Sequence, residues 1–138
     1  MAARQGPLSE RIRVLISSSD ELLGEYVIDR LSPARFDVSA VRPGVAVLDA
    51  IRRQRPHIAV LDRVHERLEA AQMEIAVVKD VCPDARIIVV SEASSASDAQ
   101  IVEAGVFFYL AERSSPPAEL LRVIEAAARS TVKPGSRT

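Results

Sequence analysis

Residues Arg55–Asp62 read RPHIAVLD, a run of four apolar residues that ends in a carboxylate. The stretch Ile58–Leu61 is continuously apolar rather than alternating, which is typical of a strand covered on both faces in a parallel sheet. A charge at the end of such a strand is seldom there for packing. The segment therefore predicts a central buried strand and makes Asp62 a candidate functional residue.

Similar apolar runs, rich in β-branched residues, recur along the chain. The further strands that they predict are Ile12–Ile16, Phe36–Val41, Ile87–Val90 and Val106–Leu110. Between them lie segments with helical spacing of apolar residues, the clearest running from Leu68 to Cys82. The other predicted helices are Glu21–Leu31, Val45–Ile51, Ser97–Ala104 and Ala118–Ala128, the last with Ser115 as its cap and Pro116 as its first residue. Strict alternation of strand and helix predicts an α/β fold, a doubly wound (βα)5 sandwich of three layers around a five-stranded parallel sheet.

The length and composition suit one globular domain. A chain of 138 residues, of which 48% are hydrophobic, can bury roughly two thirds of its unfolded surface. We expect the domain to span residues 11–130, after a flexible N-terminal segment of residues 1–10. Residues 131–138, which include Lys133, Pro134 and Gly135, are typical of a tail or linker.

The charge balance gives no general attraction to nucleic acid or to a membrane surface, because 18 basic residues face 19 acidic ones. The one local basic cluster, Arg52, Arg53 and Arg55, ends a predicted helix, where cations suit the helix dipole. The single cysteine, Cys82, cannot form an internal disulfide and fits a reducing cytoplasm. We therefore expect a cytoplasmic protein whose domain binds neither membrane nor nucleic acid directly.

The run RPHIAVLD resembles the third strand of bacterial response-regulator receiver domains, the CheY-like superfamily. In that family such a strand ends in the aspartate that accepts a phosphoryl group from a histidine kinase. The segments Ile12–Leu23 (IRVLISSSDELL), Ala85–Ala93 (ARIIVVSEA) and Glu103–Arg113 (EAGVFFYLAER) are similar to the family's first, fourth and fifth strand motifs, in the same order. The resemblance implies a flavodoxin-like sheet with the strand order 2-1-3-4-5.

The resemblance also assigns roles to residues, three of which match the family. It implies that Asp62 is the phosphoacceptor, that Ser91 contacts the phosphoryl group and that Tyr109 is the aromatic switch residue. Three positions depart from it. The family's acidic pair falls on Ser18 and Ser19, and its lysine falls on Glu112.

These departures weaken the expected chemistry. Phosphorylation of a carboxylate needs Mg²⁺ held by several oxygens, and serine hydroxyls replace carboxylates poorly. Asp62 and Asp20, with Glu21 as an alternative to Asp20 through a bridging water, are the carboxylates left for a weak Mg²⁺ site, so no tightly bound cofactor is expected. Ser18 and Glu21 alternatively have the spacing of a helix capping box. His57 and His65 are expected to be structural or solvated rather than metal ligands.

The leading hypothesis is a non-enzymatic pseudo-receiver that signals by binding proteins, such as a histidine kinase, an output domain or a second copy. Its expected dimer face is the fourth helix, fifth strand and fifth helix, with a mixed-sign surface. The interface candidates are Asp98, Glu103, Glu119, Arg122, Glu125 and Arg129. One alternative is a phosphorylatable receiver of a larger, DNA-binding response regulator. Another is a small α/β enzyme or nucleotide-binding protein. The sequence contains no Gly-rich phosphate loop and no cluster of zinc ligands that would support it.

Overall fold

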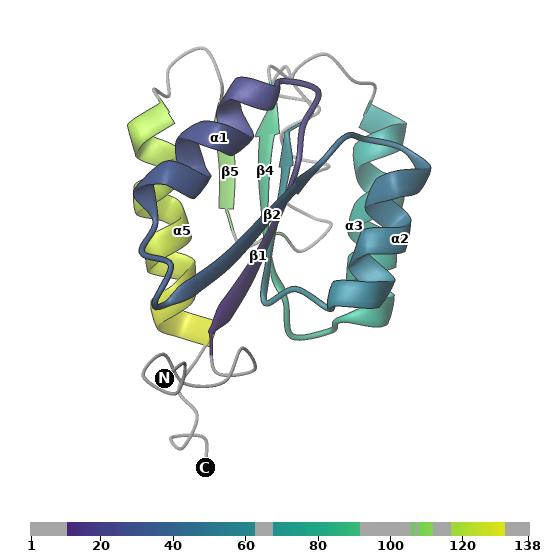
Figure 1. Cartoon of the computed structure of the whole chain (residues 1–138). Helices are drawn as coiled ribbons and strands as arrows, with labels where there is room; N and C mark the ends of the chain where they lie inside the picture. Colours follow the sequence, from purple (N-terminus) through teal and green to yellow (C-terminus); the bar gives the residue numbers. More distant parts are fainter. Residues whose placement is uncertain (1–10, 63–67, 92–105, 107, 112–116, 132–138) are drawn as a thin grey trace.

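The computed structural model describes residues 11–62, 68–91, 106, 108–111 and 117–131 (Figure 1). The strands are β1 (Ile12–Ser17), β2 (Phe36–Val41), β3 (Ile58–Asp62), β4 (Arg86–Ser91) and β5 (Phe108–Ala111). The helices are α1 (Glu21–Arg30), α2 (Val45–Gln54), α3 (Leu68–Val81) and α5 (Pro117–Thr131). The expected helix at Ser97–Ala104, the expected cap at Ser115 and the expected flexible segment 1–10 lie outside the described residues. Helix α5 ends at Thr131, and the rest of the predicted tail lies outside the described residues.

The strands form one parallel sheet in the order β2-β1-β3-β4-β5. Helices α1 and α5 cover one face of the sheet, and α2 and α3 cover the other (Figure 1). The predicted flavodoxin-like, doubly wound parallel fold is thereby confirmed. The prediction of five complete βα repeats is described only in part, because the expected helix after β4 lies outside the described residues.

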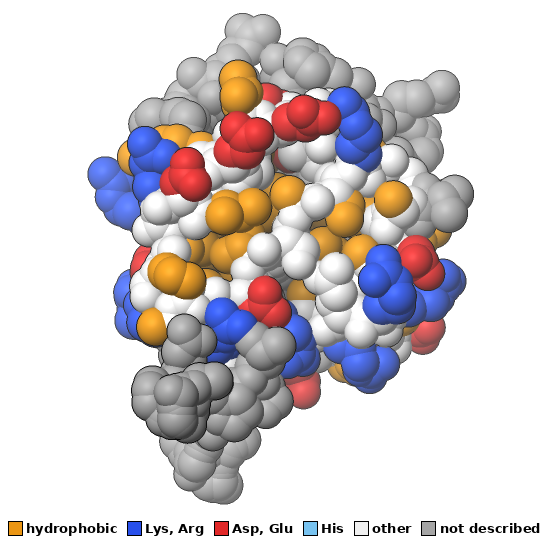
Figure 2. Space-filling model, viewed as in Figure 1, with side chains coloured by type: hydrophobic (Ala, Val, Ile, Leu, Met, Phe, Trp, Pro, Cys, Tyr) orange, Lys and Arg blue, Asp and Glu red, His pale blue; other side chains and the backbone are white. Residues whose placement is uncertain are grey.

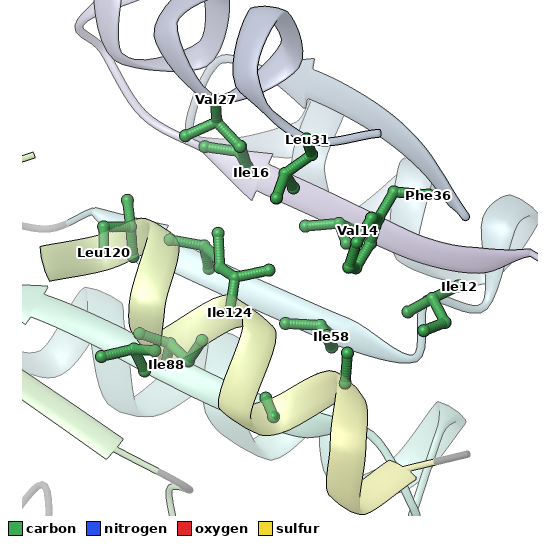
Figure 3. Packing of buried hydrophobic residues seen from close by; sticks show 14 of the residues in the cluster. Ile12, Val14, Ile16, Val27, Leu31, Phe36, Ile58, Ile88, Leu120 and Ile124 are labelled. Carbon is green, nitrogen blue, oxygen red and sulfur yellow. The ribbon is translucent and has the colours of Figure 1, made fainter. Parts of the chain in front are cut away.

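Side chains of the central strands alternate between two hydrophobic clusters. Ile58 and Val60 pack with Ile124 of α5 in the first cluster, while Ala59 and Leu61 belong to the second, on the side of α2 and α3. Figure 3 shows the first cluster from close by. All of these residues are at most 1% exposed. Burial on both faces explains the continuously apolar run, and each fully buried isoleucine contributes about 1.5–3 kcal/mol relative to an exposed one.

Helix α1 comes very close to the edge strand β2 at Gly24. A Cβ atom added at Gly24 would lie 2.8 Å from the Cβ atom of Ala40, which is closer than two carbon atoms pack. The missing side chain therefore lets α1 lie directly against β2.

Helix α2 ends through contacts with a distant strand. Arg55 adopts a left-handed conformation with φ of 47°. The Arg13 guanidinium of β1 donates hydrogen bonds to the carbonyl oxygens of Gln54 (2.8 Å) and Arg55 (2.9 Å). Arg52 and Arg53 lie exposed in the last turn of α2, as their expected place at a helix end requires, and Arg53 pairs with Asp49 one turn earlier at 3.0 Å. Arg55 differs, because its guanidinium donates to the carbonyl oxygen of Val81 at 3.1 Å and so links α2 to the end of α3.

His57 ties β3 to β1 at the edge of the sheet opposite Asp62. Its Nδ1 accepts a hydrogen bond from the backbone N–H of Arg13 at 2.9 Å, and its own N–H donates to the carbonyl oxygen of Arg13 at 2.9 Å. Burial, together with the nearby Arg13 charge, lowers the pKa of His57 below its ordinary value of 6.5. A neutral imidazole is required because protonated Nδ1 could not accept the hydrogen bond. His57 is therefore a structural residue, which agrees with the expectation that it is structural or solvated rather than a metal ligand.

The lowered pKa of His57 predicts a pH-dependent stability. Below pH 6.5 the unfolded chain takes up a proton that the folded protein resists, so the free energy of unfolding should fall as the pH falls below that value. The substitution His57→Asn keeps an acceptor for the Arg13 N–H and removes the titration. Urea unfolding at several pH values between neutral and mildly acidic should give a shallower pH dependence for His57→Asn than for the native chain. Parallel profiles for the two proteins would contradict the prediction.

Candidate functional site

The carboxyl edge of the sheet brings the end of β3 beside the loop that follows β1. Ser17 pairs with Leu61 in the parallel register of β1 and β3. The next residues along the two strands, Ser18 and Asp62, therefore lie opposite each other. In doubly wound sheets this edge, between strands whose connections leave in opposite directions, is where functional sites form.

A short hydrogen bond joins these two residues. The Ser18 hydroxyl donates to Oδ2 of Asp62 at 2.6 Å, the length of a hydrogen bond to a charged acceptor. The same Oγ accepts the backbone N–H of Asp20 at 2.9 Å, and the Ser18 N–H donates to the carbonyl oxygen of Val41 at 3.0 Å. Only 6% of Ser18 is exposed. One buried hydroxyl thus ties together β3 and the start of α1, while the backbone of Ser18 is held by β2.

The capping-box alternative for Ser18 and Glu21 is wrong. Helix α1 begins at Glu21, and its N-cap is Asp20, whose Oδ1 accepts the N–H of Leu22 at 3.0 Å. Asp20 is itself one of the best N-cap residues, so it caps the helix without help from Ser18. Glu21 instead pairs with Arg42 at 3.1 Å, across the gap between α1 and the end of β2.

The described residues do not fit a bound Mg²⁺ ion. The ion prefers an octahedral set of oxygen ligands, of which carboxylates are the usual protein anchors. Ser18 directs its proton, not a lone pair, at Asp62, and the Asp20 carboxylate is engaged at the helix N-terminus. No cluster of three or more histidine, cysteine, aspartate or glutamate side chains that could hold a metal occurs within the described ranges.

The other predicted site residues are described only in part. Ser91 is the last residue of β4, whose Val90 pairs with Asp62 of β3. Tyr109 lies in β5, opposite Val89 of β4. Ser19 is exposed, next to Ser18. Glu112 and the two interface candidates Asp98 and Glu103 lie outside the described residues, as does His65.

The interface candidates on α5 make contacts that the sequence does not reveal. Glu119 forms an ion pair with Arg122 at 2.6 Å, and Glu125 forms one with Arg35 at 3.2 Å. Arg122 and Arg129 are exposed. Arg35 was not anticipated, because it precedes β2 and lies 90 positions from Glu125 in the sequence. The α5 surface is therefore charged with both signs, but three of its four charged residues, Glu119, Arg122 and Glu125, already form ion pairs within the chain.

Comparison with protein families and with curated proteins finds no match in sequence. Solved structures do match. A CheY-like response-regulator receiver domain protein from Methanospirillum hungatei has a TM-score of 0.71 at 18% identity, over 86% of this chain and 95% of that one. The chain has the receiver-domain fold. A response regulator from Burkholderia pseudomallei, solved with a phosphorylated aspartic acid, a calcium ion and citrate, has a TM-score of 0.69 at 23% identity, over 86% of this chain and 67% of that one.

The receiver-domain fold is also found in a pilus assembly protein CpaE from Caulobacter crescentus. Its TM-score is 0.64 at 16% identity, over 84% of this chain and 98% of that one. At such identities the likeness concerns the fold, and function must be argued from the residues at the site. None of the helices in the described ranges is both long and apolar enough to cross a membrane.

Proposed function

We propose that this chain is an atypical receiver domain that acts in cytoplasmic signal transduction by binding other proteins, with little or no phosphorylation of Asp62. It is not proposed to be an enzyme. The observation that carries the proposal is the 2.6 Å hydrogen bond from the Ser18 hydroxyl to Oδ2 of Asp62. In this proposal Ser18 and Ser19 are the degenerate acidic-pair positions and Glu112 the degenerate lysine position.

The physical argument concerns charge. Phosphorylation brings an anionic carboxylate against an anionic phosphoryl donor, and a divalent cation held by carboxylates normally offsets the repulsion. A serine hydroxyl supplies one hydrogen bond and no net charge. The Ser18 proton also engages Oδ2 of the carboxylate that a cation or phosphorus would have to approach. The scaffold is thus retained while the means of neutralising the reaction is weakened.

The output of such a domain would be protein binding. Its partners would be a histidine kinase, an output domain or another signalling protein, and its dimer face would include α5. The exposed Arg122 and Arg129 and the half-buried Glu119 and Glu125 support this, because mixed charges set the register of a symmetric interface. Asp98 and Glu103 belong to the same proposed face.

Incubation with acetyl phosphate, or with beryllofluoride, in the presence of Mg²⁺ tests the proposal. We expect intact-mass spectra without phosphoryl adducts, and amide NMR spectra around Asp62 and Ser91 that beryllofluoride leaves unchanged. The Asp62→Asn variant is the matched control for adducts on other residues. An adduct or spectral change that forms in the native chain and is absent from Asp62→Asn would overturn the proposal.

That opposite outcome would establish the second candidate function, a phosphorylatable receiver of a larger, DNA-binding response regulator. The observation that favours it is the place of Asp62 at the carboxyl end of β3, beside the loop after β1. A phosphorylated aspartic acid is present in the Burkholderia pseudomallei response regulator of the same fold.

A further inference from the structure

Among the described residues, strand β2 is an edge of the sheet and pairs with β1 alone. The N–H of Ile12 donates to the carbonyl oxygen of Arg35, and the N–H of Ser18 donates to that of Val41, so these two carbonyl groups point toward β1. In a parallel strand the N–H and C=O of one residue point to the same side and alternate along the chain. The main-chain groups of Val38 and Ala40 therefore point away from β1. No described element lies beyond them, and Figure 1 shows β2 in front of the sheet, flanked by α1 and α2.

The edge lacks most of the features that keep other strands away. Natural edge strands are usually blunted by lysine, proline or a bulge. Within β2 the sequence is FDVSAV, in which Asp37 is the one charged residue. A strand of this kind can accept an added strand, with main-chain hydrogen bonds supplying affinity and side-chain pockets supplying specificity.

A cavity of about 290 Å³ adjoins the carboxyl-terminal half of β2. Its apolar part is lined by Ile16, Gly24, Ile28, Ala40 and Val41, and its polar part by Ser18, Asp20, Glu21, Glu25 and Arg42. Figure 2 shows hydrophobic side chains gathered at the centre of this face, with acidic side chains above them. The volume suits one or two side chains of a bound segment.

The rim of the cavity has an excess of negative charge. Asp20 caps α1, and Glu21 is paired with Arg42. Glu25 is exposed and forms no ion pair with the described part of the chain. Three carboxylates thus face one guanidinium, which favours a cationic side chain over an anionic one.

We propose that the outer edge of β2 binds an extended segment of a partner protein by strand addition, with a lysine or arginine side chain at the acidic rim and an apolar side chain in the cavity. This inference rests on the proposed function in one respect, namely that the domain acts by binding another protein. It names a surface distinct from α5 and the chemistry of the partner. A second copy of this chain fits less well, because antiparallel pairing of two β2 strands puts two α1 helices on the same face of the joined sheet. Each α1 carries Glu21, Glu25 and Asp29 against a single Arg30, so the pairing brings like charges together.

A peptide titration of the full chain tests the proposal. The probe is an acetylated and amidated peptide with the sequence Thr-Val-Thr-Lys-Thr-Val-Thr, which puts valine and lysine on the same face of the added strand. The control peptide has glutamate in place of lysine. The amide protons of Val38 and Ala40 should shift with the lysine peptide and become protected from hydrogen exchange, because they gain acceptors. The lysine peptide should bind at least about tenfold more tightly than the glutamate peptide.

Substitutions distinguish binding at the edge of β2 from a general attraction between the peptide and the charge of the protein. Glu25→Lys should weaken binding of the lysine peptide several-fold, whereas Asp80→Lys, which makes the same change of charge at an exposed position of α3, should not. Ala40→Pro should abolish the protection of the edge, because it removes an outward N–H without touching a bond to β1; its amide spectrum shows whether it is folded.

Equal effects of Glu25→Lys and Asp80→Lys, equal binding of the two peptides, or shifts confined to other amides would overturn the proposal. So would concentration-dependent self-association in sedimentation experiments that Ala40→Pro removes, since the occupant would then be a second copy. The acetyl phosphate experiment reports on Asp62 alone. Failure of either proposal can therefore be told from failure of the other.

Discussion

The substitution Ser18→Asp should lower the free energy of unfolding by about 4 kcal/mol at neutral pH in the presence of EDTA. The new carboxylate would replace a hydroxyl that now donates to Asp62 from 2.6 Å, in a position that is only 6% exposed. Two like charges about 4 Å apart repel by about 4 kcal/mol at an effective dielectric constant near 20. Urea unfolding with and without EDTA measures the loss. It should shrink at mildly acidic pH, because two adjacent carboxylates can share one proton.

Magnesium should reverse much of this loss in the variant and leave the native chain unchanged. A carboxylate at position 18 supplies the charged ligand that the described residues lack, so the ion would bind the folded variant and stabilise it. If the ion is present at about 100 times its dissociation constant, binding adds about 2.7 kcal/mol. The matched control is Ser19→Asp, which adds the same charge at the exposed neighbouring position. A native chain that Mg²⁺ stabilises as much as it stabilises Ser18→Asp would contradict the expectation.

The strands of this fold are predictable from sequence, but some helix ends are not. Burial on both faces leaves continuous apolar runs such as Ile58–Leu61, and these identify the sheet. Helix α2 instead continues to Gln54, beyond the predicted end at Ile51. Its last carbonyl groups are capped by Arg13, a residue of β1 about 40 positions earlier in the chain. A cap that comes from another strand leaves no local signal.

The candidate site is predictable in its position and not in its contacts. Asp62 stands out because a carboxylate ends a buried strand. The sequence around Ser18 has the spacing of a capping box with Glu21, and it gives no sign of a contact between Ser18 and β3. The choice depends on Asp20, which caps α1 by itself and leaves the Ser18 hydroxyl for Asp62. The cavity beside β2 was not anticipated at all; its one local signal is Gly24 in the middle of a helix, where glycine is otherwise unfavourable.

The hydrogen bond also changes the meaning of the acceptor position. A carboxylate at the end of a receiver-fold strand suggests phosphorylation by resemblance alone. Here the same carboxylate accepts a hydrogen bond that holds the loop after β1 against β3. In the proposed function Asp62 therefore contributes to the shape that a partner recognises, whether or not it ever carries a phosphoryl group.

Removing the hydroxyl tests this structural role directly. Ser18→Ala should lower the free energy of unfolding by about 2 kcal/mol, because a buried hydroxyl is removed and two part-buried hydrogen bonds, to Asp62 and from the Asp20 N–H, are lost with it. Ser19→Ala at the exposed neighbouring position should cost much less, and Ser18→Thr should retain most of the stability. In a double-mutant cycle with Asp62→Ala, which removes the acceptor, the two losses should not add, since the residues share one hydrogen bond. Additive losses would show that Ser18 and Asp62 act independently. The same variant can be incubated with acetyl phosphate. If Ser18→Ala also stays unmodified, the hydrogen bond is not what prevents phosphorylation of Asp62. The cause then lies in the missing charged ligands for a cation.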